Sequence, residues 1–168
     1  EKDFLGPSTL RRAIELSRNT MTVRLAQAMG ITKVADLAQR LGIYDHMPHE
    51  LAMALGAGET TLLKMTTDYS IIANGGKKVE ANCLDRCQDR YGKTVWRFDT
   101  RDCVDCKVDH YTPGMAEPDL PDKAPQVMNP YTAYQITSMM EGVVERGTGK
   151  KLLEVGKPVA GKTGTSND

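Results

Sequence analysis

The chain has 168 residues, and its 22 basic side chains balance 22 acidic ones. A hydrophobic fraction of 40% and a charged fraction of 26% are typical of one globular domain, or of a piece of a larger one, and exclude wholesale disorder. Without a basic field or an apolar run of about 18 residues, the chain gives no reason to expect nucleic acid, an anionic membrane surface or a membrane span.

The first predicted helix is amphipathic, and Pro7 suits its first turn. Its apolar stripe has helical spacing, and the charged residues lie on the opposite side. The stripe is Leu10, Ala13, Ile14 and Ser17, and the polar side carries Arg11, Arg12 and Glu15. The polar stretch 17–20 then predicts a corner between this helix and the next one.

Two more helices are expected, each ended by a glycine. The first stops at Gly30, and the second runs from an N-cap at Thr32 to Gly42. Residues 51–58 are small and apolar, which fits either a short buried strand or a tight loop. A further helix begins near Thr61 and ends at Asn74-Gly75-Gly76, a strong stop signal.

The hydrophobic period then changes from 3.6 to 2. Residues 79–88 and 94–98 predict the strands of a β-hairpin, and the proline-rich residues 99–129 predict an irregular excursion. Asn129 and Pro130 form an N-cap and N1 pair that opens a helix stopping at Gly147. The last segment, 158–165, has strand character.

Residues 156–163 match the P-loop pattern GxxxxGK[ST], which would propose nucleotide binding. A P-loop binds phosphate at the start of a helix that follows the Lys-Thr pair. Here the poor helix formers 164–168 follow, and no later apolar strand ends in Asp to hold magnesium. We therefore do not expect a nucleotide site.

The same lysine belongs to a second motif. Lys162-Thr163-Gly164 fits a KTG strand, and Ser17-Arg18-Asn19 fits an SxN corner between two helices. Further matching stretches lie between them: Thr9-Leu10-Arg11, Ala54-Leu55-Gly56, Ala73-Asn74-Gly75-Gly76, Gly142-Val143-Val144 and Gly147-Thr148-Gly149. Over about residues 4–78 and 127–168, the chain resembles the transpeptidase domain of the bifunctional, class A penicillin-binding proteins.

The resemblance implies an α/β fold in which helices flank an antiparallel sheet, as in penicillin-binding proteins and serine β-lactamases. The chain, residues 1–168, would be part of that domain. It would supply helices, the KTG strand and, over 79–126, an inserted hairpin followed by a Cys- and Pro-rich excursion without a catalytic role.

One motif of the family is missing. Its nucleophile lies in an SxxK motif, and no serine in this sequence has a lysine three places on. The motif is expected in sequence that precedes Glu1, and the chain as it stands cannot form an acyl-enzyme by that mechanism.

The resemblance assigns roles to six residues of the two motifs. Ser17 would lie in the proton path, Asn19 would hold the substrate backbone and the nucleophile's lysine, and Lys162 would place a positive charge beside Ser17. The substrate-binding residues would be Thr163, Gly164 and Thr165. The hydroxyls of Thr163 and Thr165 would meet the substrate's terminal carboxylate, and Gly164 would leave the strand face open to the substrate. The backbone amide of Thr165 would supply an oxyanion donor. All this requires Ser17 and Lys162 to line one groove.

The implied function is crosslinking of peptidoglycan stem peptides that end in D-Ala-D-Ala, by serine acyl transfer that β-lactams inhibit. The resemblance also implies a membrane anchor and a glycosyltransferase domain in the parent protein, at the periplasmic face of a bacterial inner membrane, although the N-terminus carries no signal peptide. Two alternatives remain: a β-lactamase-type hydrolase, and a non-enzymatic zinc-ribbon-like interaction module.

The zinc alternative comes from four cysteines, Cys83, Cys87, Cys103 and Cys106, whose Cx3C and Cx2C pairs approach a zinc-ribbon pattern. In a strand, Cys83 and Cys87 would lie about 13 Å apart, beyond the roughly 7 Å that a disulfide spans. Full oxidation would pair each with Cys103 or Cys106. The oxidising compartment of cell-wall synthesis favours disulfides, while zinc and free thiols remain possible. The three histidines show no metal-ligand spacing, so we expect no metal and no cofactor.

Overall fold

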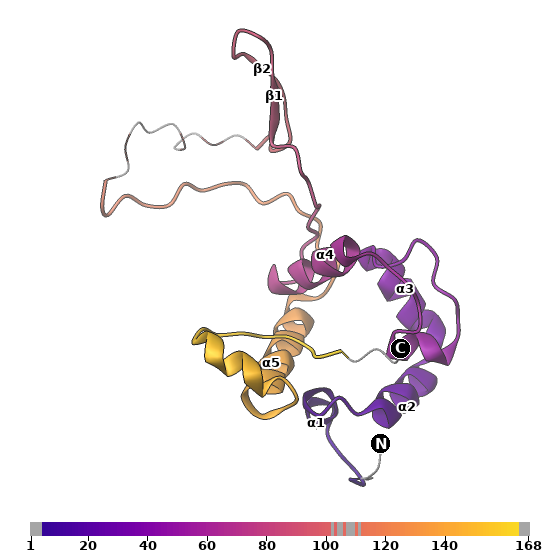
Figure 1. Ribbon diagram of the computed structural model, residues 1–168. Helices are drawn as coiled ribbons and strands as arrows, with labels where there is room; N and C mark the ends of the chain where they lie inside the picture. Colours follow the sequence, from indigo (N-terminus) through magenta and orange to yellow (C-terminus); the bar gives the residue numbers. More distant parts are fainter. Residues whose placement is uncertain (1–4, 102, 104–105, 107–109, 111, 165–168) are drawn as a thin grey trace. The chain divides into compact units, whose positions relative to one another are not determined.

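The computed structural model describes residues 5–101, 103, 106, 110 and 112–164 (Figure 1). The chain forms two compact units, one made of 1–79 with 126–168 and the other of 80–125. The first unit contains α1 (Leu10–Glu15), α2 (Asn19–Met29), α3 (Ile31–Leu41), η1 (Leu51–Leu55), α4 (Leu62–Ala73), α5 (Pro130–Arg146) and η2 (Lys150–Val155); the second contains β1 (Arg86–Gln88) and β2 (Thr94–Arg97). Within the described part of the chain, no helix is both long and apolar enough to cross a bilayer.

Side-chain caps set the starts of three helices. Thr9 accepts a hydrogen bond from the Arg12 backbone at 3.2 Å, so Pro7 lies before the cap and not in the first turn of α1 as expected. Thr61 and Asn129 cap α4 and α5 in the same way, and both were predicted as helix starts. Since Gly30 both ends α2 and caps α3, the predicted N-cap Thr32 lies inside α3.

The core of the first unit includes two apolar clusters. One joins α3, α4 and the start of α5 through Leu41, Ile71, Met128 and Ala133. The other packs α3 against the loop that follows it, through Ala35, Ala38 and Met47. The undecided segment 51–58 forms the 3₁₀ helix η1, which contributes Met53 to the second cluster. Among these residues, four are almost completely inaccessible to solvent: Ala35, Ala133, Ile71 and Met47.

α1 packs on α5, and this contact corrects one expectation. Glu15 was placed on the polar side of α1, yet it is 2% exposed. Arg146 on α5 donates two hydrogen bonds to it, from Nε at 2.9 Å and from Nη2 at 2.7 Å. Since the partner lies 131 residues away, the local pattern could not indicate that this charge is buried.

The second unit contains the predicted hairpin. β1 and β2 pair antiparallel, with Cys87 opposite Trp96, but the first strand starts at Arg86 and is shorter than the predicted 79–88. One reason is that the Asn82 side chain accepts the Leu84 backbone N–H at 3.1 Å, which forms a local turn in place of strand.

The cysteine pairing differs from the expectation. Cys103 bonds Cys106, with their Cα atoms 5.3 Å apart, whereas Cys83 and Cys87 are free thiols. Cys83 precedes β1, so it has no place in the strand ladder that was expected to bring it beside the later cysteines. Cys103 and Cys106 are close in sequence and meet locally. The described residues contain no group of three His, Cys, Asp or Glu side chains that could hold a metal.

Residues 158–164 do not form the predicted strand. Strand pairing needs a neighbouring backbone, and in the described residues this segment meets α5 instead: the Gly161 N–H donates to the Met140 carbonyl at 3.3 Å.

Candidate active site

The corner between α1 and α2 is a Schellman turn with serine at the position that usually holds glycine. The Ser17 N–H donates to the Ile14 carbonyl at 3.1 Å, and the Arg18 N–H donates to the Ala13 carbonyl at 2.8 Å. Ser17 adopts φ 53°, and no other non-glycine residue of the described chain has a positive φ. This left-handed conformation is costly for a residue with a Cβ, so it points to a local functional demand.

Lys162 meets this corner. Its Nζ donates a hydrogen bond to Ser17 Oγ at 2.8 Å and a second one to the Thr163 carbonyl at 2.7 Å. The two residues are 145 positions apart, so the expectation that they lie together is confirmed. Partial burial lowers the pKa of Lys162 from its usual value, because desolvation disfavours the ammonium.

This contact leaves the Ser17 hydroxyl ready to donate. The oxygen accepts from Lys162, so its own proton can go to a third group. A chain from ammonium to hydroxyl to an incoming base is therefore laid out, as proton transfer to a leaving group requires.

Thr148 connects the corner to the lysine segment from a second direction. Its hydroxyl lies 2.6 Å from that of Thr163, and its backbone N–H donates to the Glu15 carbonyl at 3.1 Å. In the sequence, Thr148 belongs only to a matching stretch, and no motif assigns a role to Glu15 or Arg146. The matching stretch Gly147-Thr148-Gly149 was the sequence signal that could have pointed to Thr148.

The remaining predicted residues lie as follows. Asn19 is the first residue of α2 and is exposed, directly after the corner. Thr163 and Gly164 are exposed and adjoin Lys162. Thr165, whose hydroxyl and backbone amide were expected to bind the carboxylate and the oxyanion, lies outside the described residues.

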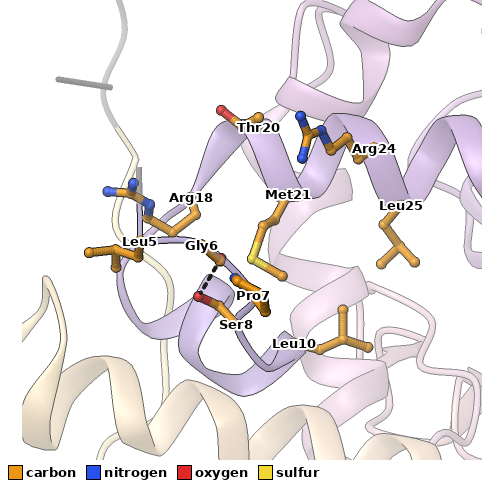
Figure 2. Close-up of a pocket in the computed structure, with 10 residues that line it drawn as sticks. All are labelled: Leu5, Gly6, Pro7, Ser8, Leu10, Arg18, Thr20, Met21, Arg24 and Leu25. Atoms are coloured by element: carbon orange, nitrogen blue, oxygen red, sulfur yellow. Dashed lines mark hydrogen bonds between the residues drawn. The ribbon is translucent and has the colours of Figure 1, made fainter. Parts of the chain in front are cut away.

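A cavity of about 770 Å³ lies beside the corner, between residues 5–10 and the start of α2 (Figure 2). In Figure 2 Met21 points toward Pro7, and Leu10 lies across from Leu25. Arg18 and Thr20 line this cavity, whereas Ser17 and Lys162 are not among its lining residues in the described part of the chain. The hydroxyl and the ammonium are thus outside this largely apolar space.

The chain matches the family model of the penicillin-binding protein transpeptidase domain over residues 1–168. The chain belongs to this family, which is a family of enzymes, and the fold and the Ser17–Lys162 pair agree with that membership. The family match does not support the β-lactamase or interaction-module alternatives.

Individual relatives of the chain have a more specific name than the family. The chain is 44% identical to penicillin-binding protein 1A of Rickettsia bellii over 100% of its own length and 21% of the relative's. It is 35% identical to penicillin-binding protein 1A of Neisseria flavescens over 98% of its length and 19% of the relative's. The chain thus spans about a fifth of the curated relatives it matches.

Two solved structures share the fold. Penicillin-binding protein 1A from Haemophilus influenzae superposes with a TM-score of 0.78 at 25% identity, covering 98% of this chain and 27% of that one. The D,D-transpeptidase domain of a peptidoglycan glycosyltransferase from Eggerthella lenta superposes with a TM-score of 0.72 at 24% identity, covering 99% and 43%. The expectation of an α/β fold, here helices with a small antiparallel sheet, is confirmed.

Proposed function

We propose that this chain forms the proton-relay side of a serine D,D-transpeptidase that crosslinks peptidoglycan stem peptides. The observation that carries the proposal is the hydrogen bond from Lys162 Nζ to Ser17 Oγ. The SxxK serine comes from outside these 168 residues, in a full-length protein anchored in the membrane and acting at the periplasmic face of a bacterial inner membrane. A glycosyltransferase domain accompanies it, as in the class A proteins that the chain resembles.

In the acylation step, the SxxK serine attacks the carbonyl between the two D-Ala residues and forms an ester. The proton of the SxxK serine passes to the lysine of the same motif. The C–N bond breaks, and the leaving D-Ala amine takes the proton of Ser17 while Ser17 takes one from Lys162. Asn19 holds the peptide backbone, and the hydroxyls of Thr163 and Thr165 donate hydrogen bonds to the terminal carboxylate beside the ammonium of Lys162.

The second step reverses these transfers. The amine of a neighbouring stem attacks the ester, and its proton returns through Ser17 toward Lys162. A β-lactam acylates the same serine, but its cleaved amide stays tethered, so no leaving group departs and the adduct persists. A β-lactamase, in contrast, would release its adduct quickly.

The test is acylation of the full-length protein by a fluorescent penicillin. Lys162→Ala should slow labelling roughly 100-fold, the scale of lost general acid–base catalysis. Lys157→Ala is the matched control, because Lys157 is an exposed lysine of the same segment outside the motif, and it should label normally. Undiminished labelling of Lys162→Ala would refute the proposal, and rapid loss of the label from the unchanged protein would favour a hydrolase.

A further inference from the structure

The end of α1 and the end of α5 approach closely because two glycines leave room for Glu15. A Cβ at Gly142 would collide with the Glu15 carboxylate, and a Cβ at Gly147 would collide with the Glu15 carbonyl oxygen. The Glu15 carboxylate is then held by Arg146, and its carbonyl accepts the Thr148 N–H. Glu15 therefore fixes the helix that ends two residues before Ser17 onto α5.

Thr148 carries this anchorage across to the lysine segment. Its side-chain hydroxyl shares a hydrogen bond with the hydroxyl of Thr163, the residue next to Lys162. One residue thus holds the Ser17 side through its backbone and the Lys162 side through its hydroxyl. Thr148 itself is exposed, so its burial contributes little to the core.

We propose that Thr148 is a positioning residue, which sets the separation of Ser17 and Lys162 by tying Glu15 to Thr163. It touches neither of the two relay atoms and acts through Thr163 and Glu15. The inference rests on the proposed function, since Thr148 would position the two residues of the same proton relay. Small displacements of reacting groups are expensive in rate, so the tie matters more for acylation than for stability.

The experiment compares Thr148→Val with Thr148→Ser in the full-length protein. Valine keeps the shape and the backbone N–H but removes the hydroxyl, whereas serine keeps the hydroxyl. We expect the first-order acylation step with a fluorescent penicillin to slow about tenfold in the valine variant, with the penicillin dissociation constant unchanged. The serine variant should acylate at nearly the normal rate, and both should melt near the unchanged protein.

Two controls separate positioning from general damage. Thr66→Val removes an exposed hydroxyl that donates within α4 to the Leu62 carbonyl at 2.8 Å, far along the chain from the relay, and should acylate normally. In a double-mutant cycle, Thr148→Val combined with Thr163→Val should be no slower than Thr163→Val alone, because both remove the same tie.

The proposal is overturned if Thr148→Val acylates normally, if Thr148→Ser is as slow as Thr148→Val, or if the two valine substitutions are additive. These results leave the proposed function standing when Lys162→Ala still blocks labelling. If Lys162→Ala labels normally, the relay itself is wrong and both proposals fall.

Discussion

Ser17 stands where two other helices of the chain use glycine. α3 ends with the Gly42 N–H bonded to Gln39 and the Ile43 N–H bonded to Ala38, and α4 repeats this pattern at Gly75. The two glycines have φ 89° and 65°, in the same left-handed region as Ser17. Serine in this place costs about 1 kcal/mol relative to glycine, and the hydroxyl facing Lys162 gives the reason for keeping it.

Replacing Ser17 should therefore separate stability from activity. Ser17→Gly relieves the left-handed strain and should raise the free energy of unfolding by about 1 kcal/mol, while removing the acceptor of Lys162 and slowing penicillin labelling. The measurements are thermal or denaturant unfolding and labelling of the full-length protein.

Ser17→Ala is the matched variant. It loses the same hydroxyl but keeps the Cβ, so its labelling should be equally slow and its stability should not rise. Equal stabilities of the glycine and alanine variants would contradict the assignment of strain to this position.

At the scale of elements, local chemistry predicted the helix ends well. Gly30, Gly42 and the Asn129-Pro130 pair mark real boundaries, because the groups that cap a helix are close to it in sequence. Features that depend on distant partners were missed. Glu15 is buried only because Arg146 reaches it, and 158–164 fails to form a strand because its described neighbour is a helix.

α4 buries a second acidic residue, Asp68. Among the described residues, it has no arginine partner of the kind that Glu15 has in Arg146. Asp68 is 7% exposed, and in the described residues its Oδ1 accepts no hydrogen bond. Burial raises the pKa of Asp68. Burial also raises the pKa of the neighbouring Tyr69, and the negative charge of ionised Asp68 adds to that rise.

The sign of the pH dependence follows from this shift. In the window above the ordinary carboxyl pKa of 3.8, the folded protein binds more protons at Asp68 than the unfolded chain, so this residue makes stability fall as pH rises. Asp68→Asn should raise the free energy of unfolding by about 1 kcal/mol at pH 7, since no buried charge remains, and by less near pH 4.

Unfolding curves of the full-length protein at the two pH values provide the test. Asp36→Asn, on the exposed side of α3, is the matched control and should change neither curve. A loss of stability at pH 7 in Asp68→Asn would show that the ionised carboxylate is stabilising.

At the scale of the whole molecule, the first unit holds together the two chain segments that flank residues 80–125. Lys77 and Gln126 form an antiparallel bridge, and the Val127 and Met128 N–H groups both donate to the Gly76 carbonyl. Gly76 has no Cβ that would collide with the Met128 carbonyl, which lets these two segments approach each other. The first unit thus closes without the 46 residues 80–125.

Replacing 80–125 by a Gly-Ser turn of about four residues should leave the relay intact, because bridged antiparallel chains need only a short connection. We expect penicillin labelling at the normal rate, and a melting temperature of the remaining protein close to normal. Reduction with dithiothreitol, which opens the Cys103–Cys106 bond in the unchanged protein, should likewise leave labelling unaffected. Loss of labelling in either experiment would show that the second unit supports catalysis.

The candidate site could be predicted only in part. The pairing of Ser17 with Lys162 was expected from the resemblance of two triplets, because those motifs carry the reacting groups. The tie through Thr148 could not be predicted from the sequence. It depends on the Thr148 hydroxyl meeting that of Thr163, 15 residues later, and on the Thr148 N–H meeting the Glu15 carbonyl in α1. The cysteine pairing was wrong because it assumed a longer first strand.

The distance along the chain between Ser17 and Lys162 also orders events during synthesis. The two residues are 145 positions apart, so the whole segment between them must leave the ribosome before the hydroxyl can meet the ammonium, whereas the capped helices and the short hairpin can form as soon as they emerge. The contact between Ser17 and Lys162 is therefore among the last parts to assemble, and a nascent or clipped chain can begin to form its capped helices before it can form this contact.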